Sequence, residues 1–151
     1  MAESMAEPDL VFVYGTLRRG EVYHDVLLDA GARFVGLGRI AGRLWDLGAY
    51  PGVVRGGGAE REAESEGGEE VRGELYRLAD PRAALTVLDE LEGHDPARPE
   101  ASLFVREEVE VRGEGGGRIA AWAWFLPREP DGATPIPGGD YGARGGRKGL
   151  R

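Results

Sequence analysis

The stretch VFVYGTLRRG, residues 11–20, joins a short apolar run to a glycine turn and two arginines. Its apolar residues fall on both parities, which predicts a strand buried on both faces at the centre of a sheet. A glycine directly after such a strand makes a tight turn and exposes successive backbone N–H groups, which can hold a carboxylate or an oxyanion. An ordinary strand end has the same residues, so the stretch alone leaves both interpretations open. Arg18 and Arg19 likewise either attract an acidic substrate or simply face solvent.

The glycines of RFVGLGRIAGRLWDLG, residues 33–48, predict a strongly bent strand, since a missing side chain permits bulges and close backbone approach. Bent strands favour a barrel over a flat open sheet. Further strands are predicted at residues 50–54, 71–78, 103–113 and 118–126. The strand at 103–113 alternates and is predicted to be half-buried, with an apolar side formed by Leu103, Val105, Val109 and Val111.

Two helices are predicted between these strands. The first is a short one within residues 21–31, where Val22, Val26 and Leu27 recur at helical spacing before a glycine. The second begins with Asp80 as N-cap and Pro81 at the first helical position, where the missing N–H of proline costs nothing. It is expected to end near Glu92, because a glycine follows.

The chain of 151 residues fits one compact domain without internal repeats. We expect this domain to span residues 9–141, with flexible tails at 1–8 and 142–151. The glycine-rich, acidic residues 55–70 predict a flexible loop. The proline- and glycine-rich residues 128–142 predict an irregular strap across the surface.

Composition excludes several kinds of function. With no cysteine the chain has no disulfide, thiolate zinc site or cysteine nucleophile, and two histidines are too few for a histidine-rich metal centre. A net charge of -8 disfavours a nucleic-acid partner. The sequence has neither the features of a signal peptide nor an apolar run long enough to span a membrane, so we expect a cytoplasmic protein, with a monomer as the default.

The end of the second helix has a carboxylate where an apolar residue is expected. At about 100° per residue, one apolar stripe is formed by Ala84, Leu85, Leu88 and Leu91. Glu92 lies about 60° from the centre of this stripe, whereas Asp89 and Glu90 fall well outside it. Desolvation and the helix C-terminus should both raise the pKa of Glu92. The pattern is compatible with an edge residue that reaches water and with a general acid/base.

Six segments in this order resemble the γ-glutamylcyclotransferase-like family, which includes the AIG2-like proteins and γ-glutamylamine cyclotransferases. They are VFVYGTLRRG, YPGVV, VRGELYRL, a helix ending in LDELEG, VREEVEV and IPGGDY. The resemblance implies a fold of the α+β class, a small mixed β-barrel with flanking helices. It also implies an enzyme without a cofactor or metal that releases 5-oxoproline from a small γ-glutamyl compound.

Carried over by position, the resemblance implies a role for five residues. The turn formed by Tyr14, Gly15, Thr16 and Leu17 would bind substrate through backbone amides, and Glu92 would be the catalytic acid/base. The chemistry is consistent with these roles, because the substrate α-amine must lose a proton to attack its own γ-carbonyl and the departing amine needs one. Attacker and electrophile share one molecule, so no covalent intermediate is required.

The sequence departs from the family at Phe104, where members often have a tyrosine, so a hydroxyl that helps to position substrate is absent. A non-catalytic binder of a small γ-glutamyl or carboxylate metabolite is therefore a second hypothesis. A protein-interaction module, suggested only by the acidic loop, is a third. Trp122, Trp124 and Tyr76 either shape the leaving-group pocket or belong to the core.

Overall fold

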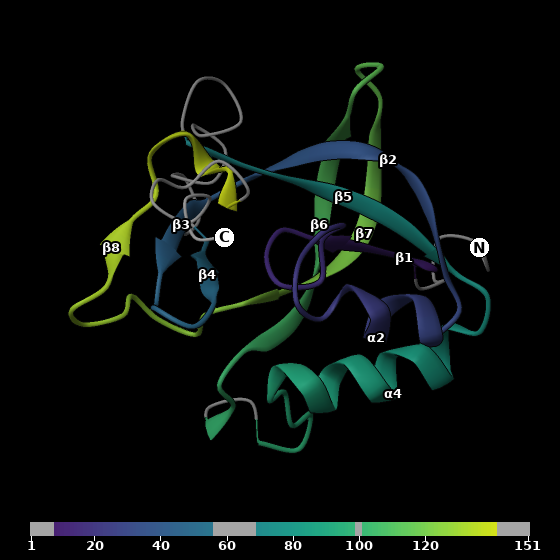
Figure 1. Cartoon of the computed structure of the whole chain (residues 1–151), viewed down its shortest axis with the longest axis horizontal. Coiled ribbons are helices and arrows are strands. Elements are labelled where there is room, and N and C mark those ends of the chain that lie inside the picture. Colours follow the sequence, from purple (N-terminus) through teal and green to yellow (C-terminus); the bar gives the residue numbers. More distant parts are fainter. Residues whose placement is uncertain (1–7, 56–68, 99–100, 142–151) are drawn as a thin grey trace.

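The computed structural model describes residues 8–55, 69–98 and 101–141, and five of its strands close into a barrel (Figure 1). In barrel order these are β1 (Leu10–Val13), β5 (Glu70–Leu78), β2 (Ala32–Ala41), β6 (Val105–Gly113) and β7 (Arg118–Phe125). Neighbouring strands are antiparallel, except that β1 and β7 are parallel. The expected small mixed β-barrel with flanking helices is confirmed.

Strand β1 is buried over its whole length, as its apolar residues on both parities predicted. Leu10 and Phe12 point into the barrel interior, where they pack with the apolar residues of the other strands. Val11 and Val13 point outward into a second apolar layer between the barrel and the helices. The strand therefore belongs to two cores at once, and its C-terminal end is held firmly in place.

Helices α2 (His24–Asp29) and α4 (Pro81–Glu92) lie together on this outer side of the barrel (Figure 1). The Asp80 side chain accepts a hydrogen bond from the Ala83 N–H, and the helix ends at Gly93 in the left-handed conformation with φ of 76°. Both ends of α4 were thus predicted correctly from their capping residues. In α2 the buried side chain is Leu27, whereas Val22 is 73% exposed and precedes the helix.

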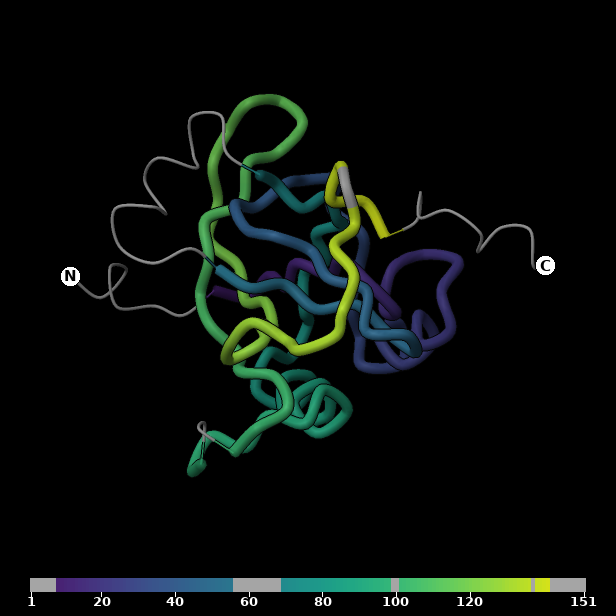
Figure 2. The backbone as a smooth tube through the Cα atoms, turned by 90° about the vertical axis from the view of Figure 1, so that its left-hand side faces the viewer, coloured from purple at the N-terminus to yellow at the C-terminus, as the bar shows by residue number. Residues whose placement is uncertain are grey.

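A second sheet consists of β4 (Pro51–Val54), β3 (Arg43–Asp46) and β8 (Thr134–Pro135) in that order. The prediction of a wholly irregular strap at 128–142 is therefore wrong, since two of its residues pair with β3 and a 3-10 turn, η2 (Pro137–Gly139), follows. Ile136 and Tyr141 also bury their side chains in the barrel core. In Figure 2 this segment is the yellow tube that crosses the barrel.

Two other local predictions have mixed outcomes. The bend expected in residues 33–48 is present, because the pairing of β2 with β5 shifts register between Phe34 and Gly36. The strand predicted from residue 103 begins only at Val105, and its first residues have the opposite burial to that expected. Leu103 is 52% exposed and Phe104 only 3% exposed, since the chain before β6 turns toward the end of α4. The predicted loop at 55–70 and both predicted tails lie mostly outside the described residues.

Candidate active site

A pocket of about 170 Å³ lies where the end of β1, the end of α4 and the start of β4 meet. All five residues named from the sequence line it, namely Glu92, Tyr14, Gly15, Thr16 and Leu17. The remaining walls are apolar or aromatic and are formed by Phe12, Val13, Tyr23, Tyr50, Pro51, Leu91, Leu103, Phe104 and Trp124. The structure thus brings together two segments that are more than 70 residues apart in the sequence.

Residues 14–17, here called the amide turn, are fixed through their carbonyl groups. The Gly15 carbonyl accepts from the Arg18 N–H at 3.0 Å, and the Thr16 carbonyl accepts from the Tyr23 N–H at 2.8 Å. The Leu17 carbonyl accepts from His24 Nδ1 at 2.9 Å. Within the described residues, the N–H groups of these three residues donate no hydrogen bond. The turn is therefore held in place while its amide donors stay available.

Gly15 is required by a close approach and not by its backbone conformation. It is absent from the glycines of the described chain that have positive φ. A Cβ atom built on Gly15 would lie 2.5 Å from Cγ and 2.9 Å from Cδ of Pro51. A proline ring cannot swing aside, so any larger residue here must move the amide turn or the start of β4. The reason for the glycine is thus the contact with Pro51.

The Tyr14 side chain is buried inside the barrel and makes two hydrogen bonds. Its hydroxyl donates to the Trp124 carbonyl at 2.6 Å and accepts from the Val53 N–H at 3.3 Å. Burial raises the pKa of Tyr14 well above its ordinary value, and the nearby Glu92 carboxylate adds to the rise. Tyr14 therefore remains neutral and ties the amide turn to β7 and β4.

Glu92 is half-buried at the last position of α4 and faces the pocket. Burial raises the pKa of Glu92 to about 7, and the negative charge of Asp89 adds to the rise. No hydrogen bond or ion pair reaches its carboxylate from the rest of the described chain. A carboxyl group with a pKa near neutrality can both take up and return a proton, which is the requirement for a general acid/base.

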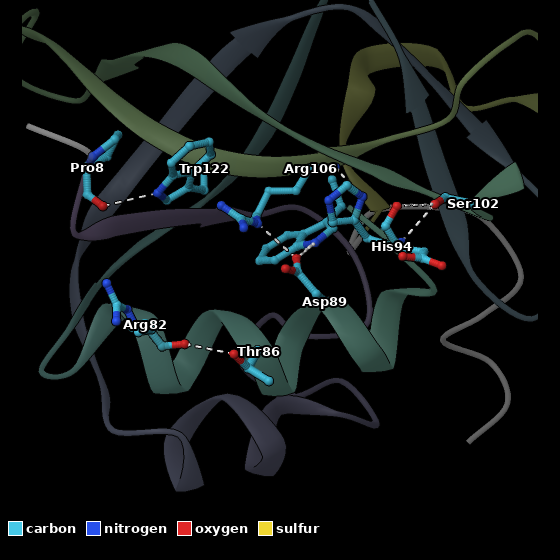
Figure 3. A network of polar contacts seen from close by, with 10 residues as sticks. Pro8, Arg82, Thr86, Asp89, His94, Ser102, Arg106 and Trp122 are labelled. Carbon is cyan, nitrogen blue, oxygen red and sulfur yellow. Dashed lines mark hydrogen bonds and ion pairs between the residues drawn. The ribbon is translucent and has the colours of Figure 1, made fainter. Parts of the chain in front are cut away.

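The prediction that Asp89 lies outside the buried face of α4 is wrong. Asp89 is only 8% exposed, and its Oδ1 accepts hydrogen bonds from Arg106 Nε and from Trp124 Nε1, both at 2.9 Å (Figure 3). These donors come from β6 and β7, so the periodicity of the helix alone could not reveal them. Conversely Leu91, assigned to the apolar stripe, is 37% exposed and lines the pocket.

The sequence left open whether Trp122, Trp124 and Tyr76 belong to the pocket or to the core, and the structure places them differently. Trp124 is buried and lines the pocket, as does Phe104, whose ring lies 5.8 Å from that of Tyr50. Trp122 does not line the pocket, and its Nε1 donates to the Pro8 carbonyl at 3.1 Å. Tyr76 is buried in the layer between barrel and helices. Of Trp122, Trp124 and Tyr76, Trp124 is thus the one that belongs to both the core and the pocket.

The two arginines after the amide turn interact with other parts of the protein and do not line the pocket. Arg18 Nη1 lies 2.8 Å from Asp140 and Arg18 Nε lies 3.7 Å from Glu74. The Arg19 guanidinium stacks over the Phe34 ring at 4.3 Å. Among the pocket residues of the described chain no side chain is cationic, and Glu92 is the sole carboxylate. No group of His, Asp or Glu side chains in the described chain converges as a metal ion would require.

A family model for γ-glutamyl cyclotransferase, AIG2-like proteins matches residues 11–143. The chain belongs to this family. It is 33% identical over 120 residues to the γ-L-glutamyl-butirosin B γ-glutamyl cyclotransferase of Niallia circulans, covering 79% of this chain and 67% of that one. The family and its relatives confirm an enzyme of the γ-glutamylcyclotransferase kind.

Solved structures have the same fold. YkqA from Bacillus subtilis aligns with a TM-score of 0.62 at 26% identity, covering 89% of this chain and 40% of that one. An AIG2-like protein from Mus musculus aligns with a TM-score of 0.61 at 24% identity, covering 83% and 82%. The described chain has no helix long and apolar enough to cross a membrane.

Proposed function

We propose that this family member cyclises the γ-glutamyl group of a small substrate, releasing 5-oxoproline and a free amine, with Glu92 as the acid/base. The observation that carries the proposal is the pairing, in one pocket, of a carboxyl group whose pKa is raised to about 7 with three backbone N–H groups that the described protein leaves unused. The first group moves protons, and the second binds negative charge.

The reaction needs two proton transfers on one face of the substrate. Glu92 takes a proton from the α-amino group, whose nitrogen attacks the γ-carbonyl carbon and closes a five-membered ring. Glu92 then gives the proton to the departing nitrogen as the C–N bond breaks. A raised pKa suits both transfers, since the carboxylate is a stronger base and its acid form persists near neutral pH.

In this proposal the amide turn binds the negative charge of the substrate. The N–H groups of Gly15, Thr16 and Leu17 would hold the α-carboxylate or the developing oxyanion, in the manner of a backbone nest. The rest of the pocket offers aromatic walls and, in the described chain, no cationic side chain. A leaving amine with its own carboxylate beside the scissile bond would face Glu92 without a compensating charge, so uncharged or cationic amines fit better.

A non-catalytic binder of the same metabolites is the second candidate, and Phe104 is the observation that favours it. Its buried ring supplies no hydroxyl to the pocket, at a position where the family resemblance implies a tyrosine. The two candidates differ in product, because only a cyclotransferase generates free 5-oxoproline.

The experiment compares two substrates that differ only in one carboxylate, γ-glutamyl-leucine and γ-glutamyl-isoamylamine, and follows 5-oxoproline by chromatography. We expect turnover of the amine derivative at least tenfold above that of the amino acid derivative. Failure to release 5-oxoproline from any member of a γ-glutamyl-amine library, with binding retained, would support the binder instead. Equal rates for the two substrates would agree with cyclisation but would refute the argument that a carboxylate on the leaving amine is disfavoured.

A further inference from the structure

The buried carboxylate of Asp89 stands one helical turn before Glu92 and faces the barrel. Its Oδ1 accepts one hydrogen bond from a strand β6 side chain, Arg106 Nε, and one from a strand β7 side chain, Trp124 Nε1. The Arg106 guanidinium in turn stacks over the Trp122 ring at 4.4 Å (Figure 3). Asp89 thus fastens the last turn of α4 to two barrel strands, and charge-assisted hydrogen bonds are the stronger kind.

The same tryptophan connects Asp89 to the amide turn. While the Trp124 ring donates to Asp89, its main-chain carbonyl accepts from the Tyr14 hydroxyl at 2.6 Å. One residue of β7 therefore makes hydrogen bonds both to the helix that carries Glu92 and to the first residue of the amide turn. Such a buried network fixes the spacing of the groups at its two ends.

Charges around Glu92 come from few elements. Asp89 lies on the same helix as Glu92. Beside Asp89 are Arg106 of β6 and His94, which follows α4, and the Arg106 N–H donates a hydrogen bond to His94 Nδ1 at 3.3 Å. The remaining titratable groups that face the same pocket are the phenols of Tyr14, Tyr23 and Tyr50, from β1, the segment before α2 and the segment before β4. Asp89 is therefore the negative side chain that Glu92 meets among the described residues.

We propose that Asp89 is a positioning residue for Glu92, which anchors the last turn of α4 to the barrel and sets the charge that Glu92 faces. This inference rests on the acid/base role proposed above for Glu92. Asp89 does not line the pocket, so its role is indirect. Its influence reaches the reaction through the position and proton affinity of Glu92, since a nearby like charge favours the protonated form of a carboxyl group.

Asp89→Asn is the test, since the amide keeps the shape and one acceptor oxygen but removes the charge. The acidic limb of the kcat/KM profile should move to lower pH by about one pH unit, because Arg106 then acts on Glu92 uncompensated. We expect kcat to fall about tenfold while KM changes little, since the remaining acceptor oxygen can still receive the Trp124 hydrogen bond and keep the amide turn in place. Glu90→Gln, the same loss of charge at the exposed neighbouring position, is the matched control and should leave the profile in place.

Carbon-13 NMR titration of the Glu92 carboxyl provides a readout that does not need turnover, with Glu92→Gln identifying its signal. The titration midpoint should fall in Asp89→Asn and rise in Arg106→Gln, which exposes Glu92 to the unpaired Asp89 charge. A folded Asp89→Asn protein with an unchanged midpoint and an unchanged pH profile would overturn the proposal. Should that variant not fold, an unchanged midpoint in Arg106→Gln would overturn it. Shifted midpoints in a protein that never releases 5-oxoproline would support the role of Asp89 while refuting the cyclisation.

Discussion

Glu74 in β5 and Glu92 at the end of α4 are both withdrawn from solvent, but their surroundings differ. Glu74 accepts hydrogen bonds from the Arg19 N–H at 3.0 Å and the Tyr76 hydroxyl at 3.1 Å, and lies 3.7 Å from Arg18. Glu92 has no such donor in the described chain, and the like charge of Asp89 raises its pKa further. A compensated carboxylate, one that has hydrogen-bond donors and a cation beside it as Glu74 has, stabilises the segment that it binds. An uncompensated carboxylate such as Glu92 can exchange a proton instead.

The largest effect that separates the two glutamates is on turnover. Glu92→Gln should reduce the rate of 5-oxoproline release on the order of a hundredfold or more with the fold intact, because the amide keeps the shape but neither accepts nor returns the proton. Glu90→Gln on the same helix should be nearly silent. Steady-state assays with circular dichroism provide the measurement. Normal rates in Glu92→Gln, or equal losses in the two variants, would show that the acid/base is another residue.

The amide turn, which lines the same pocket as Glu92, should be next in sensitivity. Gly15→Val places side-chain atoms against the Pro51 ring, where even a Cβ would lie 2.5 Å from Cγ. We expect binding of 5-oxoproline, measured by calorimetry, to weaken on the order of tenfold or more, since the displaced turn no longer presents its amides. Thr16→Ser should change little, because it leaves the backbone N–H in place and removes one methyl group. A folded Gly15→Val protein that binds like the parent would place the anion site elsewhere.

The compensated carboxylate should be important for stability. Glu74→Gln removes the charge that faces Arg18 and weakens the hydrogen bond from the Arg19 N–H, so we expect a loss of about 1–3 kcal/mol in the free energy of unfolding. Urea denaturation at pH 7 measures it. Because Glu74 does not line the pocket, the residual folded protein should retain its KM. An unaltered unfolding midpoint would remove the contrast between the two sites.

The uncompensated carboxylate should have the opposite effect on stability, and only above a certain pH. The pKa of Glu92 is raised from 4.5 to about 7, so between these values the folded state holds a proton that the unfolded state has lost. Stability therefore falls as pH rises through this window. Glu92→Gln, which cannot ionise, should unfold at a higher temperature than the parent at pH 8 and at the same temperature at pH 4. Parallel melting curves at both pH values would contradict the raised pKa.

Local signals in the sequence were enough to predict much of the fold. The two-faced apolar run of β1, the Asp80 and Gly93 caps of α4 and the glycine-rich bend of β2 each act over a few residues, so they are visible in a short window. Glu92 was found in the same way, as a carboxylate next to an apolar stripe. The resemblance to the family added the barrel and the pairing of Glu92 with the turn.

Features that depend on contacts between distant segments could not be predicted. Asp89 is buried because Arg106 and Trp124 reach it from two strands, and the helical pattern contains nothing about either donor. Gly15 is fixed by Pro51, a residue in another sheet. Phe104 is buried because the chain turns before β6, which reverses the alternation expected from residue 103.

The parallel pairing of β1 with β7 also affects how the protein folds. The Tyr14 hydroxyl bonds to a carbonyl 110 residues further along the chain, and Arg18 pairs with Asp140 across 122 residues. During synthesis β1 can pair with β5 once Leu78 has left the ribosome, but its edge toward β7 stays open until residues 118–125 follow. Proteins dominated by such distant contacts fold slowly, because the loop entropy is lost before the contacts form. A chaperone that shields residues 10–17 should therefore raise the yield of folded protein more than one that binds the hairpin of β6 and β7.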